Sequence, residues 1–496
     1  MTDSSTLTSW ADRAAGLTLP SRQVIGGQHV DSHTGATADV VSPRDGTVIA
    51  AVPDSDAGDV DAAVAAARNA FDNGWSTMAP AERKRILHRL ADAIEAHRQE
   101  LALLISLEMG KPITFAHDIE LRTTINCYRW YAEWADKLTG EVPEVGTNAL
   151  ALITREPVGV VGVAVPWNFP MTLSAWKIAP ALAAGCTVVV KPSEFSPLST
   201  LRLAEIALEA GLREGVLNVV TGDGPLTGRA LGLHPDVDSL AFTGSTTVGR
   251  AFLSYAAESN LKRVWLELGG KSPSIVLADA DLDNAIGAIA RNIFFNQGQM
   301  CTAPSRLLVH RSVHDDVVAG ISAVAATLPL GDPLDLQTRI GPLISAEHRA
   351  RVEAHTAGAL ADGALLCSGG GRPKGLTYGF YFEPTVLDGV TPHMAIARDE
   401  VFGPVLSVLS FDDIDEAIAV ANDSIYGLAA AVFTRELSAA HRVSRRLRAG
   451  TVWVNCYEEG DMTVPFGGYK QSGNGRDKSQ HALDKYTELK TTWMQL

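Results

Sequence analysis

The sequence has few cysteines and none of the paired spacings that bind zinc or build a disulfide framework. Its five cysteines, Cys127, Cys186, Cys301, Cys367 and Cys456, are an odd number at scattered positions with no Cys-x-x-Cys pair. This pattern fits reduced thiols better than a disulfide framework or a structural zinc site. We therefore predict a cytoplasmic protein without a metal site.

Long hydrophobic runs and an excess of positive charge are also absent. No apolar segment approaches the roughly 20 residues that a membrane-spanning helix needs. The polar N-terminus, Met1 to Ala11, has neither the basic start nor the apolar core of a targeting peptide. The chain has 42 basic and 57 acidic residues, a formal net charge of -15, which disfavours nucleic acid and anionic membranes as partners. We expect neither.

The composition is that of an ordinary folded protein with more than one core. The 496 residues are 46% hydrophobic and 20% charged, without a low-complexity block, so two or three domains are expected. Short β-favouring runs separated by glycine turns predict a small β region at 24–51. Helical periodicity then predicts one helix at 57–71 and a second from Pro80 to near Gly110.

Runs of β-branched residues alternate with helical segments in the middle of the chain. Helical patterns at 173–184 and 201–210 separate nearly unbroken apolar runs. Because apolar strands of this kind are buried on both faces, the alternation predicts a parallel sheet covered by helices on both sides. The predicted strands are 158–165, 187–190, 217–220, 239–242 and 262–268.

The predicted strands end in polar or glycine-containing turns, where a doubly wound sheet binds its ligand. Asn168 follows the first strand, Lys191 the second, Gly222 the third and Gly244 the fourth. A glycine turn that opens a helix suits a pyrophosphate, because free N–H groups and the helix dipole attract an anion. Neither glycine turn has the usual GxGxxG spacing, and ordinary turn chemistry is the alternative for each.

Cys301 stands in a polar, glycine-containing turn directly after an apolar run. A thiol displayed in this way is a candidate nucleophile, although a lone cysteine is more often a small buried hydrophobic residue. A base and an oxyanion donor would complete the machinery, and the candidates are Glu267 after the fifth strand and Asn168 after the first. With an electron acceptor over the glycine turns, this set is suited to oxidising a carbonyl group.

Seven motifs, in order along the chain, resemble those of the aldehyde dehydrogenase superfamily, and the similarity spans about 24–493. They are PWNFP at 166–170, KPSE at 191–194, FTGS at 242–245, ELGGK at 267–271, GQMC at 298–301, EVFGP at 400–404 and PFGGYK at 465–470. The resemblance implies an α/β fold with a Rossmann-type NAD-binding domain at 1–138 and 155–266 and an α/β catalytic domain at 267–466. It further implies a β oligomerisation element, formed by a protruding hairpin at 139–154 and a C-terminal strand at 482–496, in a homotetramer or homodimer.

The resemblance also implies a reaction in which NAD(P) oxidises an aldehyde to a carboxylic acid. The Cys301 thiolate attacks the aldehyde carbon, the Asn168 amide and the Cys301 N–H hold the oxyanion, hydride leaves for the nicotinamide, and a water activated by Glu267 hydrolyses the thioester. The family's cofactor contacts correspond here to Val165, Pro166, Trp167, Lys191, Ser193, Glu194, Gly224, Phe242, Gly244, Ser245, Val248, Leu268, Gly269, Glu400 and Phe402.

Two positions bear on cofactor choice and proton transfer. The Glu194 carboxylate can accept hydrogen bonds from a 2′-hydroxyl and repels a 2′-phosphate, so NAD is expected as the cofactor, with NADP a second candidate because Lys191 offsets part of the repulsion. The family often has Gly-Arg-Glu where this chain has Asp477 after Gly-Arg. Whether this shorter side chain can serve in the proton relay assigned to that glutamate is left open.

The block 460–479 resembles the branch that contains γ-glutamyl-γ-aminobutyraldehyde dehydrogenase of putrescine breakdown. Glu120, Glu458, Glu459 and Asp461 are predicted to give the substrate tunnel an acidic mouth that favours an amino aldehyde, a solvated rim being the alternative. Other candidate functions are a broad-specificity aliphatic or betaine-type aldehyde dehydrogenase, a cofactor-free thiol hydrolase or esterase, and a catalytically silent homologue. The predicted apolar walls, or alternatively plain core residues, are Phe169, Trp176 and Phe466.

Overall fold

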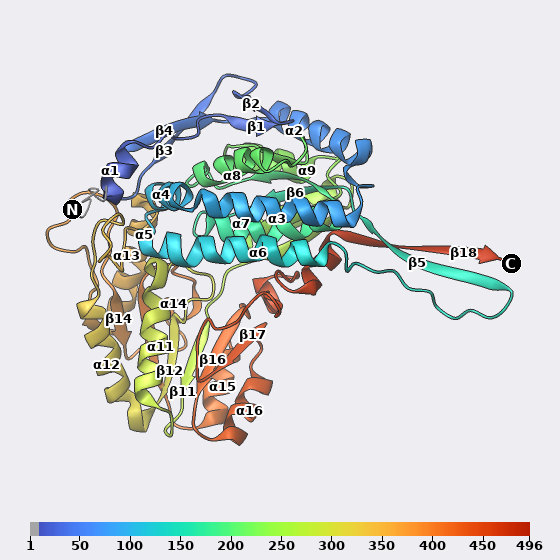
Figure 1. Ribbon diagram of the computed structural model, residues 1–496. Coiled ribbons are helices and arrows are strands. Elements are labelled where there is room, and N and C mark those ends of the chain that lie inside the picture. The colour runs from blue at the N-terminus through green and yellow to red at the C-terminus, as the bar shows by residue number, and fades with distance from the viewer. Residues whose placement is uncertain (1–8) are drawn as a thin grey trace, which may run out of the picture.

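The chain forms two sheets, each covered by helices, and a two-stranded arm that projects from the body (Figure 1). The structure is a computed structural model and describes residues 9–496. Residues 1–8, which begin the predicted N-terminal domain and the segment judged not to be a targeting peptide, lie outside the described range. No helix within residues 9–496 is long and apolar enough to cross a membrane.

The first sheet contains the strands predicted in the middle of the chain. Its order is β10-β9-β6-β7-β8-β1-β2, with β10 to β8 parallel and with β1 and β2 antiparallel at the edge. The predicted doubly wound parallel sheet is therefore confirmed. The strands are β1 (Gln23–Ile25), β2 (Gln28–Val30), β6 (Val160–Ala164), β7 (Thr187–Lys191), β8 (Leu217–Val219), β9 (Ser239–Thr243) and β10 (Arg263–Glu267).

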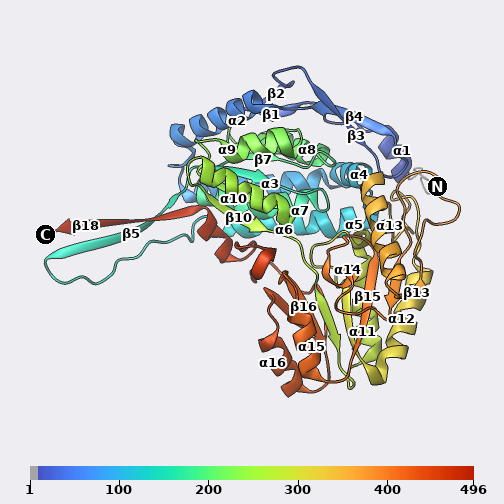
Figure 2. The same ribbon diagram turned by 180° about the vertical axis from the view of Figure 1, so that it is seen from behind.

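Helices cover both faces of this sheet (Figures 1 and 2), as its apolar strands predict. Val161 and Val163 belong to the core formed with α3, α6, α7 and α8, whereas Val160 and Ala164 belong to the core formed with α2 and α10. Alternate residues of a strand thus face opposite cores. The helices are α2 (Ala57–Ala70), α3 (Pro80–Ala96), α4 (Arg98–Met109), α6 (Leu121–Trp134), α7 (Pro170–Ala184), α8 (Leu198–Glu209), α9 (Arg229–Leu233) and α10 (Thr246–Glu258).

The single helix predicted from Pro80 to near Gly110 is wrong, because the structure has two helices there. His97, at φ -94° and ψ 13°, separates α3 from α4. No glycine or proline marks this break, so the sequence pattern runs through it. The predicted end is correct, since Gly110 terminates α4 in the left-handed conformation at φ 77°.

The second sheet is formed by the C-terminal half of the chain and has the order β13-β14-β15-β12-β11-β16-β17. Its strands are parallel except for β13 at the edge. The strands are β11 (Pro273–Val276), β12 (Arg306–His310), β13 (Leu365–Ser368), β14 (Thr385–Asp388), β15 (Val405–Phe411), β16 (Ala429–Phe433) and β17 (Thr451–Val454). The accompanying helices are α11 (Leu282–Phe294), α12 (His314–Thr327), α13 (Ala346–Ala361), α14 (Ala395–Arg398), α15 (Ile414–Asn422) and α16 (Leu437–Arg446).

The chain passes from the first sheet to the second directly after Glu267, the last residue of β10. Glu267 pairs with Gly473 in an isolated antiparallel bridge, and the Leu268 N–H donates to the Ser472 carbonyl at 2.9 Å. The segment around residue 473 therefore lies against the crossing between the sheets. This contact brings the last part of the chain to the strand ends where the ligand site is predicted.

The projecting arm consists of β5 (Ala149–Pro157) and β18 (Thr487–Gln495), which pair antiparallel along their whole length (Figures 1 and 2). The predicted C-terminal strand is present, and it pairs with β5, while within 139–154 the chain also returns on itself through backbone hydrogen bonds between Glu141 and Ile153 at 2.8 and 2.9 Å. The remaining α-helices and strands in residues 9–496 are α1 (Trp10–Ala15), α5 (Ile113–Phe115) and the ribbon β3 (Thr37–Val41) with β4 (Val48–Pro53).

Candidate active site

Cys301 lies in a strained loop that follows α11 and a 3-10 turn. Within that turn Asn296 and Gln297 have φ angles of 50° and 59°, in the left-handed region that side chains rarely adopt. The Gln297 amide donates to the carbonyl of Gly110, at the end of α4, at 2.9 Å. The conformation of the cysteine loop is thus maintained by contacts with other parts of the fold.

The segment after Glu267 packs directly against Cys301, whose side chain is half-buried. A Cβ atom on Gly270 would lie 2.5 Å from the Cys301 carbonyl oxygen, a distance that real Cβ contacts do not reach. Only glycine therefore permits this approach of the two backbones. The close approach brings the predicted base and the predicted nucleophile to the same place.

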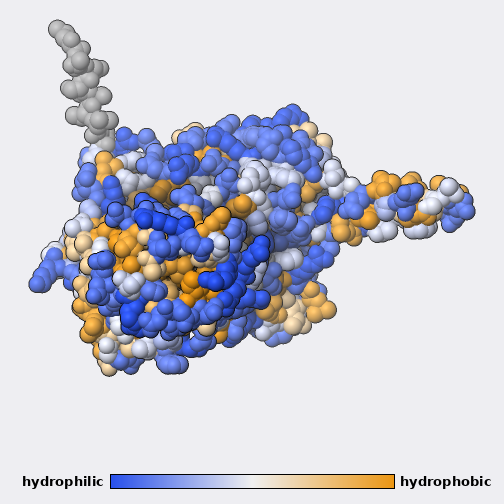
Figure 3. Space-filling model, turned by 90° about the horizontal axis from the view of Figure 1, so that it is seen from below, coloured by the Kyte–Doolittle hydropathy of each residue, from blue (hydrophilic) through white to orange (hydrophobic). Residues whose placement is uncertain are grey.

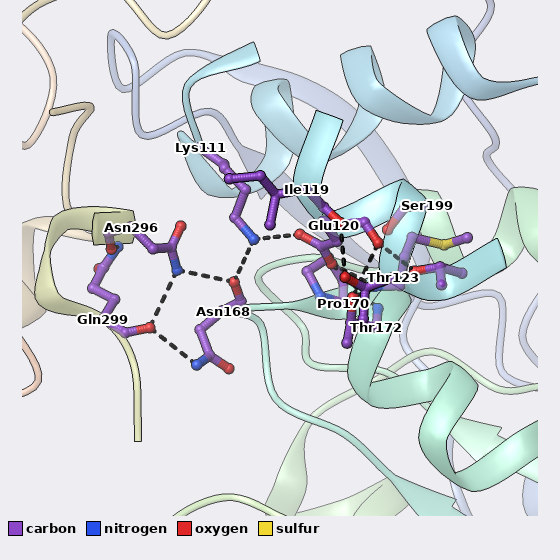
Figure 4. A network of polar contacts seen from close by, with 12 residues as sticks. Lys111, Ile119, Glu120, Thr123, Asn168, Pro170, Thr172, Ser199, Asn296 and Gln299 are labelled. Carbon is purple, nitrogen blue, oxygen red and sulfur yellow. Dashed lines mark hydrogen bonds and ion pairs between the residues drawn. The ribbon is translucent and has the colours of Figure 1, made fainter. Parts of the chain in front are cut away.

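Asn168 is buried beside the cysteine loop, two residues after the turn that ends β6 (Figure 4). Its Nδ2 donates to the Gln299 carbonyl at 3.0 Å, and its own carbonyl accepts from Asn296 Nδ2 at 3.1 Å. A side-chain amide carries two N–H donors, so Asn168 retains one for an oxyanion that forms next to Cys301.

The Glu267 side chain is buried, and neither carboxyl oxygen has a hydrogen-bond partner among residues 9–496. Burial raises the pKa of Glu267 well above its ordinary value, and the charge of Asp477 raises it further, whereas Lys177, Lys485 and Arg476 lower it. A buried carboxyl group of raised pKa accepts a proton more readily near neutral pH than an ordinary carboxylate does. These surroundings suit a general base.

Asp477 and two lysines form a buried cluster whose charges act on Glu267. Asp477 Oδ2 lies 2.8 Å from Lys177 Nζ, and Asp477 Oδ1 accepts from Lys485 Nζ. Burial alone would raise the pKa of Asp477, but the two ammonium groups hold it below its ordinary value. The sequence identified Asp477 as shorter than the usual glutamate, and it gave no sign of its partners Lys177 and Lys485.

The surroundings of Cys301 oppose ionisation of its thiol. Burial raises the pKa of Cys301 well above its ordinary value, and the carboxyl groups of Glu267, Glu458 and Glu400 raise it further. The N–H of Thr302 lowers it by a smaller amount. In these surroundings the thiol is protonated at neutral pH, so a nucleophilic thiolate requires a base or a nearby positive charge.

Lys191 and Glu194 occupy the end of β7 as predicted, but they have different environments. Lys191 is buried and donates to the carbonyls of Pro192 and Gly222 at 2.8 and 2.7 Å. Glu194 is exposed, with a carboxylate oxygen 3.9 Å from the Lys191 ammonium. The Glu194 carboxylate is thus accessible to ligand hydroxyl groups, whereas most of the hydrogen-bonding capacity of the Lys191 ammonium group is used by backbone carbonyls.

The turn between β9 and α10 is built around Gly244 and Ser245. A Cβ atom on Gly244 would lie 2.4 Å from the Phe242 ring, and Ser245 Oγ accepts the Val248 N–H at 3.3 Å. Ser245 and Val248 are exposed at the start of the helix, where a pyrophosphate is expected. Of the other predicted cofactor residues on this sheet, Gly224 is exposed, Pro166 is half-buried, and Val165, Ser193 and Leu268 are buried.

Glu400 reaches across from the second sheet to the segment that follows Glu267. Its Oε1 accepts the Gly270 N–H at 3.0 Å, and a Cβ atom on Gly269 would lie 2.2 Å from its Oε2. Burial raises the pKa of Glu400 to about 7. The Oε2 atom of Glu400 therefore lies near the crossing between the sheets, where it can accept a hydrogen bond from a ligand hydroxyl.

Phe402 adopts the left-handed conformation at φ 57°. Its carbonyl accepts from His348 Nε2 at 2.7 Å, and its ring meets the edge of the Trp167 ring at a centroid distance of 5.4 Å. His348 lies far away in the sequence and was not predicted. Phe402 is thus an aromatic residue held in a strained conformation, which suits the flat ring of a dinucleotide. The accessible carboxylates of Glu194 and Glu400 suit its two riboses.

Aromatic side chains predicted to line the substrate tunnel form two pairs. Trp176 packs against Phe466 at a centroid distance of 5.1 Å, and Phe169 stacks on Phe295 at 6.1 Å. Phe295, in the apolar run before Cys301, was not among the predicted residues. Trp176 and Phe169 are half-buried, so both retain accessible surface for an apolar ligand.

The predicted acidic residues near position 460 occur together with a lysine that the sequence did not indicate. Glu458, Glu459 and Asp461 are exposed. The pKa of Glu458 is nevertheless raised by desolvation, as expected for an accessible group with protein on several sides. The half-buried Lys478 interacts electrostatically with Glu458 and Asp461 and offsets part of their negative charge.

Glu120 is not part of this acidic region, in contrast to the prediction. It is buried and bonded to Lys111, and its other oxygen accepts the N–H groups of Met171 and Thr172 at 3.0 and 3.3 Å (Figure 4). Its charge is compensated in the interior and is not presented to a substrate. The sequence gave no sign that the Glu120 side chain is buried.

Comparisons with known proteins find similarity along almost the whole chain. The model of the aldehyde dehydrogenase family matches residues 29–492. Aminoacetaldehyde dehydrogenase of Pseudomonas aeruginosa is 50% identical over 497 residues, which cover 100% of this chain and 99% of that protein.

Two solved structures are similar over the same extent. γ-Glutamyl-γ-aminobutyraldehyde dehydrogenase from Burkholderia cenocepacia has a TM-score of 0.96 and 53% identity, covering 98% of this chain and 99% of that one. A variant of indole-3-acetaldehyde dehydrogenase from Pseudomonas syringae, in complex with NAD+ and IAA, has a TM-score of 0.97 and 51% identity with the same coverage.

Proposed function

The chain belongs to the aldehyde dehydrogenase family, and we propose that it oxidises an aldehyde to a carboxylic acid through a thioester on Cys301, with NAD as the hydride acceptor. The proposal is carried by one observation. The half-buried Cys301 lies beside the buried amide of Asn168 and is influenced electrostatically by the unpaired carboxyl group of Glu267. A nucleophile, an oxyanion donor and a base thus converge from three parts of the chain.

In the first step the Cys301 sulfur adds to the aldehyde carbon and the carbonyl oxygen becomes negatively charged. The free N–H of the Asn168 amide and the backbone N–H of Cys301 hold this oxyanion. Because these donors are already oriented before the reaction, they stabilise the charge as it develops. The thiol proton must leave beforehand, and Glu267 is the carboxyl group that acts most strongly on Cys301.

A bound NAD would supply a hydride acceptor, and loss of hydride from the carbon attached to Cys301 would convert the adduct to a thioester. The residues that would hold the cofactor are Glu194 and the turn of Gly244 and Ser245 on the first sheet, and Glu400 with Phe402 on the second. Their task is to bind the riboses and the pyrophosphate so that the ring faces Cys301.

In the last step Glu267 removes a proton from water, and the resulting hydroxide attacks the thioester carbon. The carbon–sulfur bond breaks, and the products are a carboxylate and the free Cys301 thiol. Asp477, bonded to Lys177 and Lys485, tunes the proton affinity of Glu267 through its charge. This electrostatic role differs from the proton relay assigned to the family's glutamate, because no hydrogen bond joins Asp477 to Glu267 among residues 9–496.

An amino aldehyde is the substrate class that we propose, in the chemical range of aminoacetaldehyde and γ-glutamyl-γ-aminobutyraldehyde. Support comes from the names of two similar proteins and from the exposed acids Glu458 and Asp461, which would attract an ammonium group. The aromatic pairs of Trp176 with Phe466 and of Phe169 with Phe295 favour a second candidate, a flat aromatic aldehyde such as indole-3-acetaldehyde. A broad-specificity aliphatic or betaine-type enzyme is the third.

A homodimer or homotetramer assembled through the arm is also part of the proposal. Figure 3 shows hydrophobic residues along the projecting arm, among hydrophilic ones. Leu489, Trp493 and Leu496 are exposed there, and an exposed apolar edge strand is suited to pairing with another subunit. The five free cysteines fit a location in the reducing cytoplasm.

The proposed activity is tested by following the absorbance of the reduced nicotinamide with NAD and with NADP, using γ-aminobutyraldehyde, indole-3-acetaldehyde and propanal. We expect reduction of NAD that depends on the aldehyde and is abolished in Cys301→Ala. Turnover that persists in that variant would remove Cys301 from the mechanism. Ester hydrolysis without any aldehyde-dependent reduction would favour the thiol hydrolase instead.

A further inference from the structure

A buried ion pair holds the loop that carries Asn168 (Figure 4). Lys111 lies just beyond the end of α4, and Glu120 ends the π-helical turn that precedes α6. Their side chains are bonded to each other and have no exposed surface. Neither residue is contiguous in sequence with the cysteine loop or with the turn after β6, yet Lys111 reaches the short segment between β6 and α7, and Glu120 reaches the first turn of α7.

Glu120 caps α7, which begins directly after that segment. The helix starts at Pro170, and Phe169 at its N-cap makes no side-chain capping bond. Glu120 Oε1 supplies the missing acceptor to the N–H groups of Met171 and Thr172 at 3.0 and 3.3 Å. A carboxylate in this place satisfies free donors and complements the helix dipole, so it determines where α7 and the residues before it begin.

Lys111 makes the second contact with the same segment. Its Nζ donates to the Asn168 carbonyl at 2.9 Å and lies 3.7 Å from the centre of the Phe169 ring. The Asn168 carbonyl also accepts from Asn296, which belongs to the cysteine loop. The backbone of Asn168 is therefore fixed from both sides, by the ion pair on one and by the cysteine loop on the other.

A comparison within the chain separates capping from this second task. Glu108 is also a buried carboxyl group, and it caps α8 in the same way by accepting the N–H groups of Leu198 and Ser199. It also accepts from the Ser199 hydroxyl, no ion pair with a cation is found for it among residues 9–496, and burial raises its pKa to about 8. A carboxyl group can thus cap a helix here without a lysine, and what Lys111 adds beside Glu120 is a positive charge together with a contact to Asn168.

We infer that Lys111 and Glu120 are positioning residues for catalysis, which orient the Asn168 amide toward the oxyanion formed at Cys301. The inference rests on the proposed function, in which Asn168 is the oxyanion donor. Glu120 fixes the start of α7, and Lys111 fixes the carbonyl of Asn168, while the side-chain amide of the same residue donates to the Gln299 carbonyl of the cysteine loop. Oxyanion donors lose most of their effect when displaced by a fraction of an ångström, so the pair acts on the rate through Asn168.

The test uses two double variants of the full-length enzyme that both remove the buried charges. Lys111→Met with Glu120→Gln loses the donor to Asn168, whereas Lys111→Gln with Glu120→Gln retains an amide donor at position 111. In both, the amide oxygen at position 120 can still cap α7. We expect kcat/KM for propanal to fall at least tenfold in the first variant and to recover in part in the second. The dissociation constant of NAD should stay within twofold, and Glu108→Gln is the matched control with unchanged kcat/KM.

A double-mutant cycle with Asn168→Ala distinguishes positioning from a general loss of structure. In that background the two substitutions at positions 111 and 120 should change kcat/KM by less than twofold, because the amide through which they act is gone. A loss of the same size in both backgrounds would overturn the inference. If Asn168→Ala alone leaves kcat/KM unchanged, the proposed role of Asn168 fails, and the positioning role fails with it.

If the variant that carries methionine does not fold, as judged by circular dichroism, the comparison is made with the variant that carries glutamine at both positions, in the two backgrounds. We again expect the substitutions to lower kcat/KM less in the Asn168→Ala background than in the parent background, with a smaller difference between the two. Equal effects in the two backgrounds would again contradict the positioning role.

Discussion

The ammonium group of Lys485 is bonded to the carboxylate of Asp477 in the interior, where both side chains are nearly inaccessible to solvent. With Lys177 on the other oxygen of Asp477, the cluster carries one net positive charge. Glu267 is close enough to be affected by all three groups. An ionised Glu267 would make the set neutral, with two ammonium and two carboxylate groups, so Lys485 favours the basic form of Glu267.

Replacing Lys485 should therefore move the pH dependence of turnover. Lys485→Met removes a positive charge that lowers the pKa of Glu267, so this pKa should rise and the basic form should require a higher pH. We expect the acidic limb of the kcat profile to shift upward by about one pH unit. The measurement is kcat between pH 5.5 and 9.5, with the exposed Lys490→Met as control. A shift to lower pH would show that the cluster acts in another way.

Glu267→Gln should separate formation of the thioester from its hydrolysis. Glutamine cannot accept the proton of the attacking water, so steady-state turnover should fall by roughly a hundredfold to ten-thousandfold. The same substitution removes a charge that raises the pKa of Cys301, so alkylation of the thiol by iodoacetamide should reach half its maximal rate at a lower pH. Stopped-flow absorbance and the pH dependence of alkylation measure the two effects. Slower alkylation at every pH would contradict the electrostatic assignment.

Glu194→Gln should weaken the preference for NAD over NADP. The Glu194 carboxylate is exposed beside Lys191, and removing its charge eliminates the repulsion of a 2′-phosphate while the lysine remains. We expect kcat/KM for NADP to rise roughly tenfold, which corresponds to about 1.4 kcal/mol, and that for NAD to fall by less. Glu144→Gln, a change of the same kind near the arm, is the control. An unchanged ratio of the two cofactors would remove Glu194 from cofactor selection.

Glu458→Gln should lower the preference for a positively charged aldehyde. The Glu458 carboxyl group acts on Cys301, but Lys478 offsets part of its field, so the effect should be modest. The ratio of kcat/KM for γ-aminobutyraldehyde to that for propanal should fall about fivefold at low salt and less at high salt. Glu459→Gln, at the adjacent exposed position, should leave the ratio unchanged. A ratio that is insensitive to both substitutions would favour the aromatic aldehyde as substrate.

Trp493→Glu should disrupt assembly through the arm. Trp493 is exposed on β18, and a carboxylate in an apolar interface would cost several kcal/mol. Sedimentation velocity at micromolar concentration should show a shift from an oligomer to a monomer. Leu437→Glu, an exposed leucine of α16, is the matched control and should leave the oligomeric state unchanged. A monomeric parent protein would refute assembly by any route.

The sequence predicted those parts of the fold and site that depend on local pattern. Apolar β-branched runs identified β6 to β10, because a strand buried on both faces needs such residues along its whole length. The polar residues that follow these strands identified Asn168 and Glu267, since the ends of parallel strands meet at one edge of the sheet. The same local reasoning missed the break at His97, where the helical periodicity continues without interruption.

Residues that reach the site from elsewhere could not be predicted in this way. Lys111 contacts Asn168 across 57 residues, and His348 contacts Phe402 across 54. Their positions depend on the packing of separate helices and strands, which the spacing of residues along the sequence does not encode. A lysine is normally expected at the surface, so the sequence gave no reason to place Lys111 or Lys485 in the interior. Glu120 was misplaced for the same reason, because its burial depends on the partner that neutralises it.

The left-handed residues Asn296 and Gln297 also affect how this protein would respond to selection for heat resistance. Each is held in a backbone conformation that costs an L-residue about 1–2 kcal/mol. Glycine at position 297 would relieve that cost in the folded state, yet it would also remove the hydrogen bond from Gln297 to the Gly110 carbonyl and loosen the turn that orients Asn168 and Cys301. The gain in backbone energy is thus offset by a lost buried hydrogen bond, and the geometry needed for turnover is disturbed. Engineering for stability should therefore begin elsewhere in the chain.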